Sequence, residues 1–355
     1  MRNKFLSVSV YFLVFLVCAA SCDKTALSGS DSADSQTPGE KARDKQEPQS
    51  PQTPGTPQTP ESPQTPGSPQ TPESPQTPGT QQTPGAALTT WYVSENGNDS
   101  ASGGGADSPL ATVSAALGRI KALYRGGKWP QGQSAVIIVS GRIMGSGTFP
   151  NGAMVDVSGA GNYPPIILRG DPVTGGVLDA NRTGGAEGLV MYIANNKVTL
   201  EDKLVLTGGR RLWGGGVCIG THGIESRGEF VMAGGEISGN KSGAGGGVMV
   251  YKGSMSMLGG VIKNNGNDFN HNGGSGGGVY LQSGDEVYFT MSGGKIEQNG
   301  DSKTENGGGL YIDGNINAVM TGGEITGNSS LLKGGGVYIA PYGEFTMSAG
   351  TVSGN

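Results

Sequence analysis

The chain has 355 residues, of which 67 are glycine, 20 are proline and only 15% are charged. Its formal net charge is -5 and it has no long run of lysine and arginine, which argues against a nucleic-acid partner. The two histidines and three cysteines do not occur at the paired spacings of a zinc site or a disulfide framework, so we expect no metal site and no other cofactor.

The first 21 residues have the pattern of a signal peptide. Two basic residues precede an apolar run from Phe5 to Val17, and small residues then lead to Cys22. That run is shorter than the roughly 20 residues that cross a bilayer. The end of the leader resembles the lipobox of bacterial lipoproteins, which implies that Cys22 is the lipid attachment site and that the exported protein is anchored at the outer membrane or cell surface. Ala19 stands where lipoboxes usually carry leucine, so ordinary cleavage after Ser21 is the alternative.

Residues 22–89 form a polar tether that follows the leader. From Pro51 the chain repeats Pro-Gln-Thr-Pro, separated by small or acidic residues. Such a segment cannot build a core, and closely spaced prolines favour an extended polyproline II spacer that rises about 3.1 Å per residue. We therefore expect a disordered Pro-rich linker that acts as a stalk and holds the folded part away from a membrane.

Residues 90–213 have the pattern of an N-terminal cap followed by irregular first coils. Trp91 to Ser94 is expected to form a strand, and Ser108 with Pro109 is expected to cap a helix. Apolar residues in that helix recur at intervals of three and four: Val113, Ala116, Leu117, Ile120, Leu123 and Tyr124. Further strands are expected at Ala135–Val139, Pro165–Leu168, Leu189–Ile193 and Val198–Leu206.

Residues 214–355 contain five copies of one phrase: three glycines, an apolar-x-apolar triplet, a methionine, a small pair, a β-branched residue and an asparagine. The copies begin at Gly214, Gly245, Gly276, Gly307 and Gly334, so that successive starts are 31, 31, 31 and 27 residues apart. Self-similarity at this period predicts a stack of repeated units in place of one globule.

Each copy contains three short strand patterns. In the third copy, Val279 and Leu281 flank a tyrosine, Phe289 and Met291 alternate with polar residues, and Ile296 follows a glycine pair. Alternation places these apolar residues on one face of their strands, where they can share a core. The sequence therefore predicts an all-β protein, a parallel β-helix solenoid whose equivalent residues stack about 4.8 Å apart.

The entry of the folded part also resembles a known family. Tyr92–Ser94, Ser108–Thr112, the helix through Ile120 and the run Val136–Val139 resemble the start of right-handed parallel β-helix proteins of the pectin-lyase-like superfamily, in which the helix closes one end. The Gly-Gly repeats resemble those of polymorphic outer-membrane proteins and related adhesins. The resemblance implies the fold but not one activity, because this solenoid carries lyases, hydrolases and adhesins.

An asparagine falls eight residues after every repeat methionine. In a stack these amides can donate to and accept from one another, so we expect a structural ladder and no ligand role. The ladder residues are Asn240, Asn265, Asn299, Asn328 and Asn355.

No catalytic residues can be assigned from the sequence. The resemblance implies that lyases of this fold use clustered Asp and Glu to bind calcium together with an Arg or Lys base, and that hydrolases use several Asp on adjacent coils. The column after the glycine pairs is mixed instead: Glu236, Val261, Lys295, Glu324 and Thr351. A polysaccharide lyase or glycoside hydrolase of the β-helix fold therefore remains the alternative to a non-catalytic protein.

The middle residues of the triplets are the candidate binding residues. Tyr280, Tyr311 and Tyr338, continued by Met249 and Cys218, are expected to point outward as a rigid amphipathic stripe that suits contact with a protein or a glycan. Cross-coil stacking without a ligand is the alternative.

A long loop completes the candidate surface. The segment from Gly266 to Ser275, with Asp268, Phe269 and His271, is expected to project beside the stripe. The whole pattern favours a lipid-anchored, non-catalytic structural or adhesive binding module that meets a host or neighbouring-cell surface protein or glycan.

Overall fold

The computed structural model describes residues 89–146, 148–149, 152–183, 186–221, 226–268, 274–284 and 286–355. The predicted signal peptide, Cys22 and nearly all of the tether lie outside these residues. None of the helices in the described ranges has the length and apolar character that a bilayer crossing requires.

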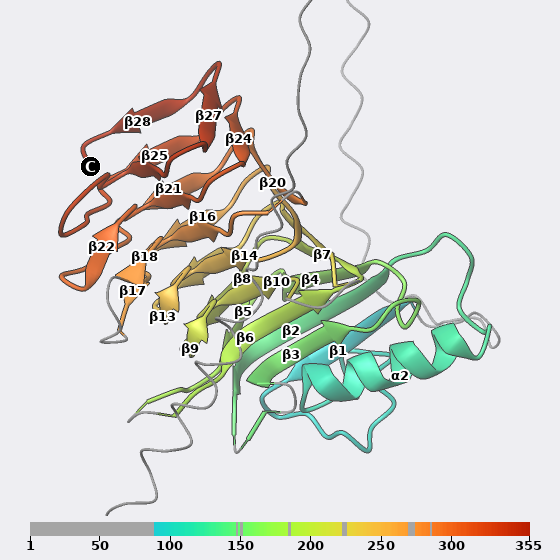
Figure 1. Cartoon of the computed structure of the whole chain (residues 1–355). Coiled ribbons are helices and arrows are strands. Elements are labelled where there is room, and N and C mark those ends of the chain that lie inside the picture. Colours follow the sequence, from blue (N-terminus) through green and yellow to red (C-terminus); the bar gives the residue numbers. More distant parts are fainter. Residues whose placement is uncertain are drawn as a thin grey trace, which may run out of the picture. The chain divides into compact units, whose positions relative to one another are not determined.

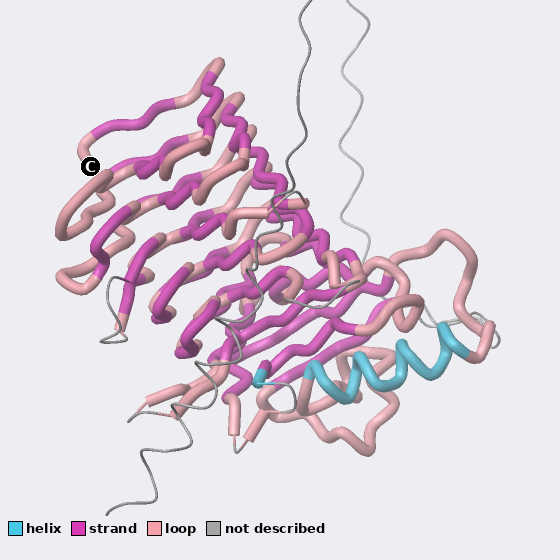
Figure 2. The backbone as a smooth tube through the Cα atoms, viewed as in Figure 1, coloured by secondary structure: helices cyan, strands magenta, loops and turns pink. Residues whose placement is uncertain are grey.

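The described part is a parallel β-helix in which every strand pairs with the equivalent strand of the next coil (Figures 1 and 2). We name its faces A to D. Face A consists of β1 (Thr90–Ser94), β2 (Ala135–Met144), β4 (Ile166–Gly170), β7 (Lys197–Leu200), β11 (Gly228–Met232), β15 (Gly253–Met257), β20 (Val287–Met291), β24 (Asn317–Met320) and β27 (Glu344–Met347). The long strand β2 bends from face A into face B and so joins these two faces into one sheet.

The other faces follow the same stacking order. Face B continues from β2 through β5 (Gly176–Asp179), β8 (Leu204–Thr207), β12 (Glu236–Ser238), β16 (Val261–Lys263), β21 (Lys295–Glu297), β25 (Glu324–Thr326) and β28 (Thr351–Ser353). Face C holds β3 (Ala153–Ser158), β6 (Leu189–Ala194), β10 (Val217–Ile219), β14 (Val248–Val250), β19 (Val279–Leu281), β23 (Leu310–Ile312) and β26 (Val337–Ile339). Face D holds β9 (Arg210–Trp213), β13 (Lys241–Ala244), β17 (Gly266–Asn267), β18 (Gly274–Ser275) and β22 (Thr304–Asn306).

The predicted all-β fold with three strands in each repeat is confirmed, and face D is an addition that the repeat pattern did not reveal. Face C has seven strands, one from each of seven coils. The strands before Gly214 pair in register with those of the repeats, so the early coils continue the same faces. The predicted run Val198–Leu206 is two strands, β7 and β8, because the chain turns at Lys203 with a φ of +61°.

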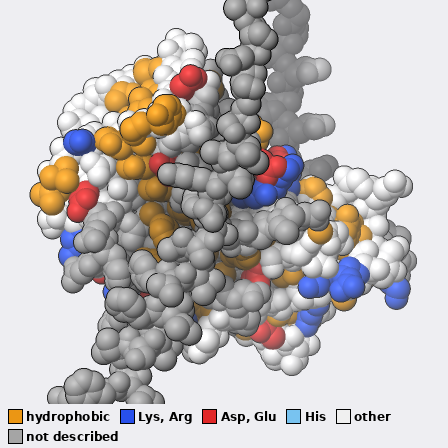
Figure 3. All heavy atoms as spheres, in the orientation of Figure 1, with side chains coloured by type: hydrophobic (Ala, Val, Ile, Leu, Met, Phe, Trp, Pro, Cys, Tyr) orange, Lys and Arg blue, Asp and Glu red, His pale blue; other side chains and the backbone are white. Residues whose placement is uncertain are grey.

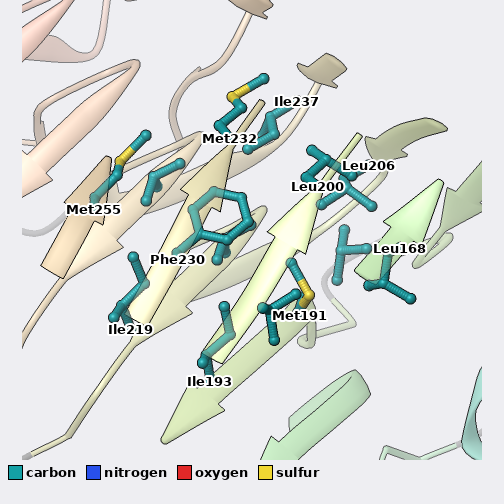
Figure 4. Packing of buried hydrophobic residues seen from close by; sticks show 14 of the residues in the cluster. Leu168, Met191, Ile193, Leu200, Leu206, Ile219, Phe230, Met232, Ile237 and Met255 are labelled. Carbon is teal, nitrogen blue, oxygen red and sulfur yellow. The ribbon is translucent and has the colours of Figure 1, made fainter. Parts of the chain in front are cut away.

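The core is a continuous column of apolar side chains enclosed by faces A, B and C. Phe230, Met232 and Ile237 come from two faces of one coil and are fully buried, and Figure 4 shows them beside the equivalent residues of neighbouring coils. The alternation predicted for the strands is therefore confirmed in the interior coils. In the coil of β26 to β28 the same positions are partly open, and Met347 and Val352 are 41% and 39% exposed.

The predicted capping helix is present as α2 (Val113–Arg125), which packs on the first strands and buries Val113, Leu117 and Ile120. Its N-cap is Thr112, whose hydroxyl accepts a hydrogen bond from Ala115 N at 3.1 Å. The prediction that Ser108 caps the helix is wrong. Leu110 instead bridges in parallel to Val93 of β1, which holds the chain extended until residue 112. Tyr124 also leaves the predicted apolar stripe and is 37% exposed.

Each of the three glycines in a repeat is required for its own physical reason, as the copy that starts at Gly307 shows. Gly307 has a φ of +64°, and a Cβ there would lie 2.9 Å from Tyr311 Cβ. A Cβ on Gly308 would lie 2.1 Å from the carbonyl oxygen of Ser329. A Cβ on Gly309 would lie 2.6 Å from the carbonyl oxygen of Gly336 and 2.9 Å from the side-chain nitrogen of Asn328. The triplet therefore fits a left-handed turn, a close backbone crossing and the asparagine ladder in that order.

Replacing Gly307 with alanine should lower the free energy of unfolding by about 1–3 kcal/mol, because a left-handed backbone disfavours any Cβ and this Cβ also meets Tyr311. Urea unfolding of the purified protein measures the change. Gly118→Ala in α2 is the matched control, because a Cβ there meets no atom within 4 Å and alanine favours helix, so this variant should be as stable as the parent or more so. Equal losses in both variants would contradict the explanation.

Candidate functional site

The five repeat asparagines form one continuous hydrogen-bonded ladder between faces B and D. The Asn265 side-chain nitrogen donates to Asn299 Oδ1 at 3.0 Å and to the carbonyl oxygen of Ile237 at 2.9 Å. Its Oδ1 accepts from both the backbone and the side-chain nitrogen of Asn240. Asn299, Asn328 and Asn355 repeat this arrangement. Since the amides of the inner coils are buried and saturated by one another, this column holds the turns together and offers nothing to a ligand.

A second buried polar stack lies on face D, and the sequence analysis missed it. Asn267 donates to the carbonyl oxygens of Ser242 and Gly243 in the coil below. Its Oδ1 accepts from Thr304 Oγ1 at 2.7 Å in the coil above. The residues differ from coil to coil, so no repeated letter marks the stack in the sequence. It fixes both ends of the long loop, because Asn267 also donates to the carbonyl oxygen of Ser275.

Asn265→Ala should lower the free energy of unfolding by about 3 kcal/mol, because it leaves buried donors and acceptors of two neighbouring coils without partners. Chemical denaturation of the purified protein gives the value. The control is Asn317→Ala, at an exposed residue that accepts one hydrogen bond from Thr346, and it should change the free energy by less than about 0.5 kcal/mol. A harmless Asn265→Ala would show that the ladder does not stabilise the turns.

The three candidate tyrosines lie one above the other on face C. Tyr280 pairs in register with Tyr311, which pairs with Tyr338. The ring centroids of Tyr280 and Tyr311 are 4.6 Å apart with planes 4° from parallel, and those of Tyr311 and Tyr338 are 5.0 Å apart at 30°. Since the rings stack face to face, both faces of Tyr311 are covered. Tyr280 and Tyr338 each have one face covered by Tyr311, so the column presents ring edges, hydroxyl groups and at most its two end faces to its surroundings.

Cys218 and Met249 continue this column in register, but the expectation that they point to the surface is wrong. Met249 is fully buried and Cys218 is 9% exposed. They belong to a small second cluster outside face C that includes Ala244 at the end of β13. Face D brings the chain over this part of face C, so two of the five residues of the column are buried in a second, smaller hydrophobic cluster. Burial also raises the pKa of the Cys218 thiol to about 12, which leaves it an unreactive apolar side chain.

Of the three stacked tyrosines, Tyr280 is the one whose hydroxyl contacts Asp313. Its hydroxyl lies 3.4 Å from Asp313 Oδ2, an oxygen that also lies 3.3 Å from the amide nitrogen of Gln282. Burial, followed by the charge of Asp313, raises the pKa of Tyr280 far above its usual range. Tyr311 shows the same direction and the same first cause. Both phenols are therefore held in their neutral form.

The projecting loop is placed only at its base. Asp268 forms an ion pair with Arg210, in which Arg210 Nε lies 2.6 Å from Asp268 Oδ2. The hydrogen bond from Arg210 holds the pKa of Asp268 below its usual range. Residues 269–273, with Phe269 and His271, lie outside the described ranges. The loop therefore leaves face D from a base that is fixed by this ion pair and by Asn267.

An open groove of about 560 Å³ lies at the corner where face C turns into face A. Its floor includes Lys197, Glu229, Ser254 and Tyr288, which are partners in register on four successive strands of face A. The remaining lining residues come from α2, from the neighbouring turns and from the first residues of β11 and β15: Tyr124, Gly161, Tyr163, Pro165, Asn195, Asn196, Arg227, Gly228, Gly253 and Glu286. Only the stacking of coils brings these segments together, and the sequence analysis did not predict this site.

The aromatic residues of the groove differ from the stacked tyrosines in their exposure. Tyr288 is 61% exposed and Tyr124 is 37% exposed, on separate elements. Tyr163 is half-buried, with Lys121 Nζ 5.8 Å from its ring centroid. Open aromatic side chains beside polar groups are typical of small-molecule sites, which are concave and carry a few polar groups that fix orientation. The groove therefore exposes aromatic ring surface, whereas in the stack on face C the rings largely cover one another.

The charged residues of the groove are paired with one another. Lys197 Nζ lies 2.5 Å from Glu229 Oε1. Glu286 is paired with Arg227 and, at 2.8 Å, with Lys252. On the face that Figure 3 views, acidic and basic side chains adjoin near the centre, while basic side chains gather at the lower right. The four charged residues that line the groove, two cations and two carboxylates, therefore cancel in formal charge, while Lys252 and Lys121 beside it are additional cations.

The outward column of face B is mixed, as its sequence indicates. Glu236, Val261, Lys295 and Glu324 are partners in register, and Lys295 Nζ lies 2.9 Å from Glu324 Oε2. Within the described ranges no three His, Cys, Asp or Glu side chains are grouped so that they could hold a metal ion.

Comparison of the chain with protein-family models, with curated proteins and with solved structures finds no match. What the chain binds must therefore be argued from its own surfaces.

Tyr280→Phe should make stability less sensitive to alkaline pH. The folded state holds the Tyr280 proton more tightly than the unfolded chain, so the free energy of unfolding of the parent should fall as the pH rises above the usual tyrosine pKa of about 10. Phenylalanine has no proton to lose, and the fall should be smaller in the variant. Urea unfolding at about pH 8 and about pH 11 checks this. Identical pH profiles would contradict the burial of this phenol.

Proposed function

We propose that the protein is a cell-surface lipoprotein whose β-helix serves as a non-catalytic, adhesive binding module carried on the Pro-rich stalk. The observation that carries the proposal is the groove at the corner of faces C and A, where exposed Tyr124 and Tyr288 flank polar residues from four coils. Aromatic side chains give large contact area at small entropic cost. A rigid solenoid holds them in place before a partner arrives, which lowers the cost of binding.

The sequence in front of the β-helix supports display at a surface. The signal-peptide pattern, Cys22 after small residues and the proline repeats fit an exported chain that is anchored by lipid and extended from the membrane. A partner on a host or neighbouring cell, either a protein or a glycan, would meet such a module. The membrane anchor and the groove thus have separate tasks, attachment to the cell and contact beyond it.

The groove is the primary contact surface in this proposal, and the tyrosine stack is the secondary one. Tyr280 and Tyr311 cover each other's rings and leave edges and hydroxyl groups for contact. Such a surface can donate hydrogen bonds but cannot take up a flat apolar group. The stack also stabilises the coils, so its loss affects folding as well as contact.

Removal of the groove aromatics should abolish adhesion. Tyr124→Ala with Tyr288→Ala should reduce binding of the purified protein to the target cell surface at least tenfold, because both open rings are lost, whereas neither ring is in the buried core. Flow cytometry of labelled protein on cells measures binding. Tyr342→Ala is the control, since this tyrosine is 85% exposed and outside the groove, and it should bind as the parent does.

The stack is tested by a separate variant. Unchanged adhesion after Tyr280, Tyr311 and Tyr338 are all replaced by serine would remove the stack from the proposal. Release of reducing sugar or of unsaturated products from polysaccharides by the parent protein would overturn the non-catalytic reading and favour a polysaccharide-degrading enzyme.

Cys22→Ala should abolish incorporation of labelled fatty acid and release the protein from the membrane fraction, because the proposed acylation site is gone. Metabolic labelling followed by fractionation is the measurement. In cells that make the parent, protease treatment of the intact surface should remove the β-helix from immunoblots. Fatty-acid incorporation that persists in the variant would contradict lipid attachment at this cysteine.

A further inference from the structure

The floor of the groove at the corner of faces C and A consists of polar side chains and one aromatic side chain. Its successive coils contribute Lys197, Glu229, Ser254 and Tyr288 in register. Because neighbouring strands lie about 4.8 Å apart, these four positions extend over roughly 14 Å along the solenoid. The site is therefore long enough for a short stretch of a linear chain molecule that lies parallel to the solenoid axis.

Both ends of this floor carry aromatic surface. Tyr288 lies at one end, on β20. At the other end Pro165 lies just before β4, whose first residue Ile166 pairs with Val198, so Pro165 is one coil below Lys197. Tyr124 and Tyr163 line that end of the same groove. A ligand that spans the floor can thus contact a ring at each end and polar groups between them.

The polar middle of the groove discriminates by charge. Lys197 and Glu229 neutralise each other at 2.5 Å, and Glu286 neutralises Arg227 while also contacting Lys252. An anionic polymer would have to compete with Glu229 and Glu286 for these cations, and the displaced carboxylates would then lie next to like charge. A paired carboxylate or ammonium group still has lone pairs or N–H donors for a hydroxyl group.

Asn196 lies at the corner of the groove, and hydrogen bonds hold its side chain in place. Asn196 uses its side-chain nitrogen on the carbonyl oxygens of Val157, Gly159 and Ala194, at 3.3, 3.3 and 2.7 Å. These bonds fix the side-chain amide of Asn196, which is one of the residues that line the groove. Hydroxyl groups, which both donate and accept, suit such a mixture of fixed acceptors and charged donors.

We infer that this groove binds an uncharged glycan chain. The pyranose ring has an apolar C–H face that packs on the electron-rich face of an aromatic ring, and its rim of hydroxyl groups matches the paired charges and the amide of the floor. The tyrosine stack on face C is less suited to this contact, because both faces of Tyr311 and one face each of Tyr280 and Tyr338 are covered within the stack. The inference rests on the proposed function and names the ligand class of its primary surface.

The test is affinity electrophoresis and calorimetry of the full-length protein with soluble neutral glycans, namely a glucan, a mannan and a galactan, and with polygalacturonate as the anionic probe. At least one neutral glycan should bind. Its affinity should change little as salt is raised, because no net charge is matched. Tyr288→Ala and Tyr124→Ala should each weaken it at least tenfold, whereas Tyr342→Ala should not.

Circular dichroism of each variant checks that the β-helix is intact, and both replaced side chains are solvent-exposed. Failure of all three neutral glycans, or salt-sensitive binding of polygalacturonate in their place, would overturn the inference. If the groove variants still lose adhesion to cells in that case, the proposed function stands with a different ligand. If the parent protein does not adhere to cells at all, the proposed function itself fails.

Discussion

In-register stacking of one coil on the next is the constraint on which the rest of the structure depends. A strand of three residues such as β19 has too few hydrogen bonds to be stable alone, and it exists because β14 and β23 pair with it on both sides. The same register aligns the turns. Asn265 can saturate its amide only because Asn240 and Asn299 stand directly below and above it. The hydrophobic core and the polar ladder are thus two results of one geometry.

Stacking also determines what the outer faces can present. When the same residue occupies equivalent positions of neighbouring coils, the two copies lie about 4.8 Å apart. Like charges would then repel each other, and flat aromatic rings stack. Face B avoids repulsion by alternating Lys295 with Glu324, and face C stacks Tyr280 on Tyr311. The side chains of such an outward column therefore tend to pair with their neighbours in the column and not with a partner molecule. Groups that remain available for a partner, such as Tyr288, are found where the repeat is broken.

The groove illustrates how such a break creates a site. Its charged residues are paired across coils, with Glu286 held between Arg227 and Lys252. Its rings come from α2, from the segment between β3 and β4, and from one position of face A, where the three preceding strands carry Lys197, Glu229 and Ser254 in register with Tyr288. Because the backbone beneath is a rigid solenoid, these side chains are displayed without the ordering cost of a flexible loop.

The sequence by itself determined the parallel β-helix, its inward residues and the asparagine column, because each depends on a residue type that recurs at the same place in every copy of the repeat. It could not give the cap at Thr112, the burial of Met249 or the stack around Asn267, which depend on chain segments with no shared pattern. The groove also belongs to that second group. Its lining comes from positions as distant as Tyr124 and Tyr288, and only the winding of the coils, which is fixed by packing between coils, brings them to one corner.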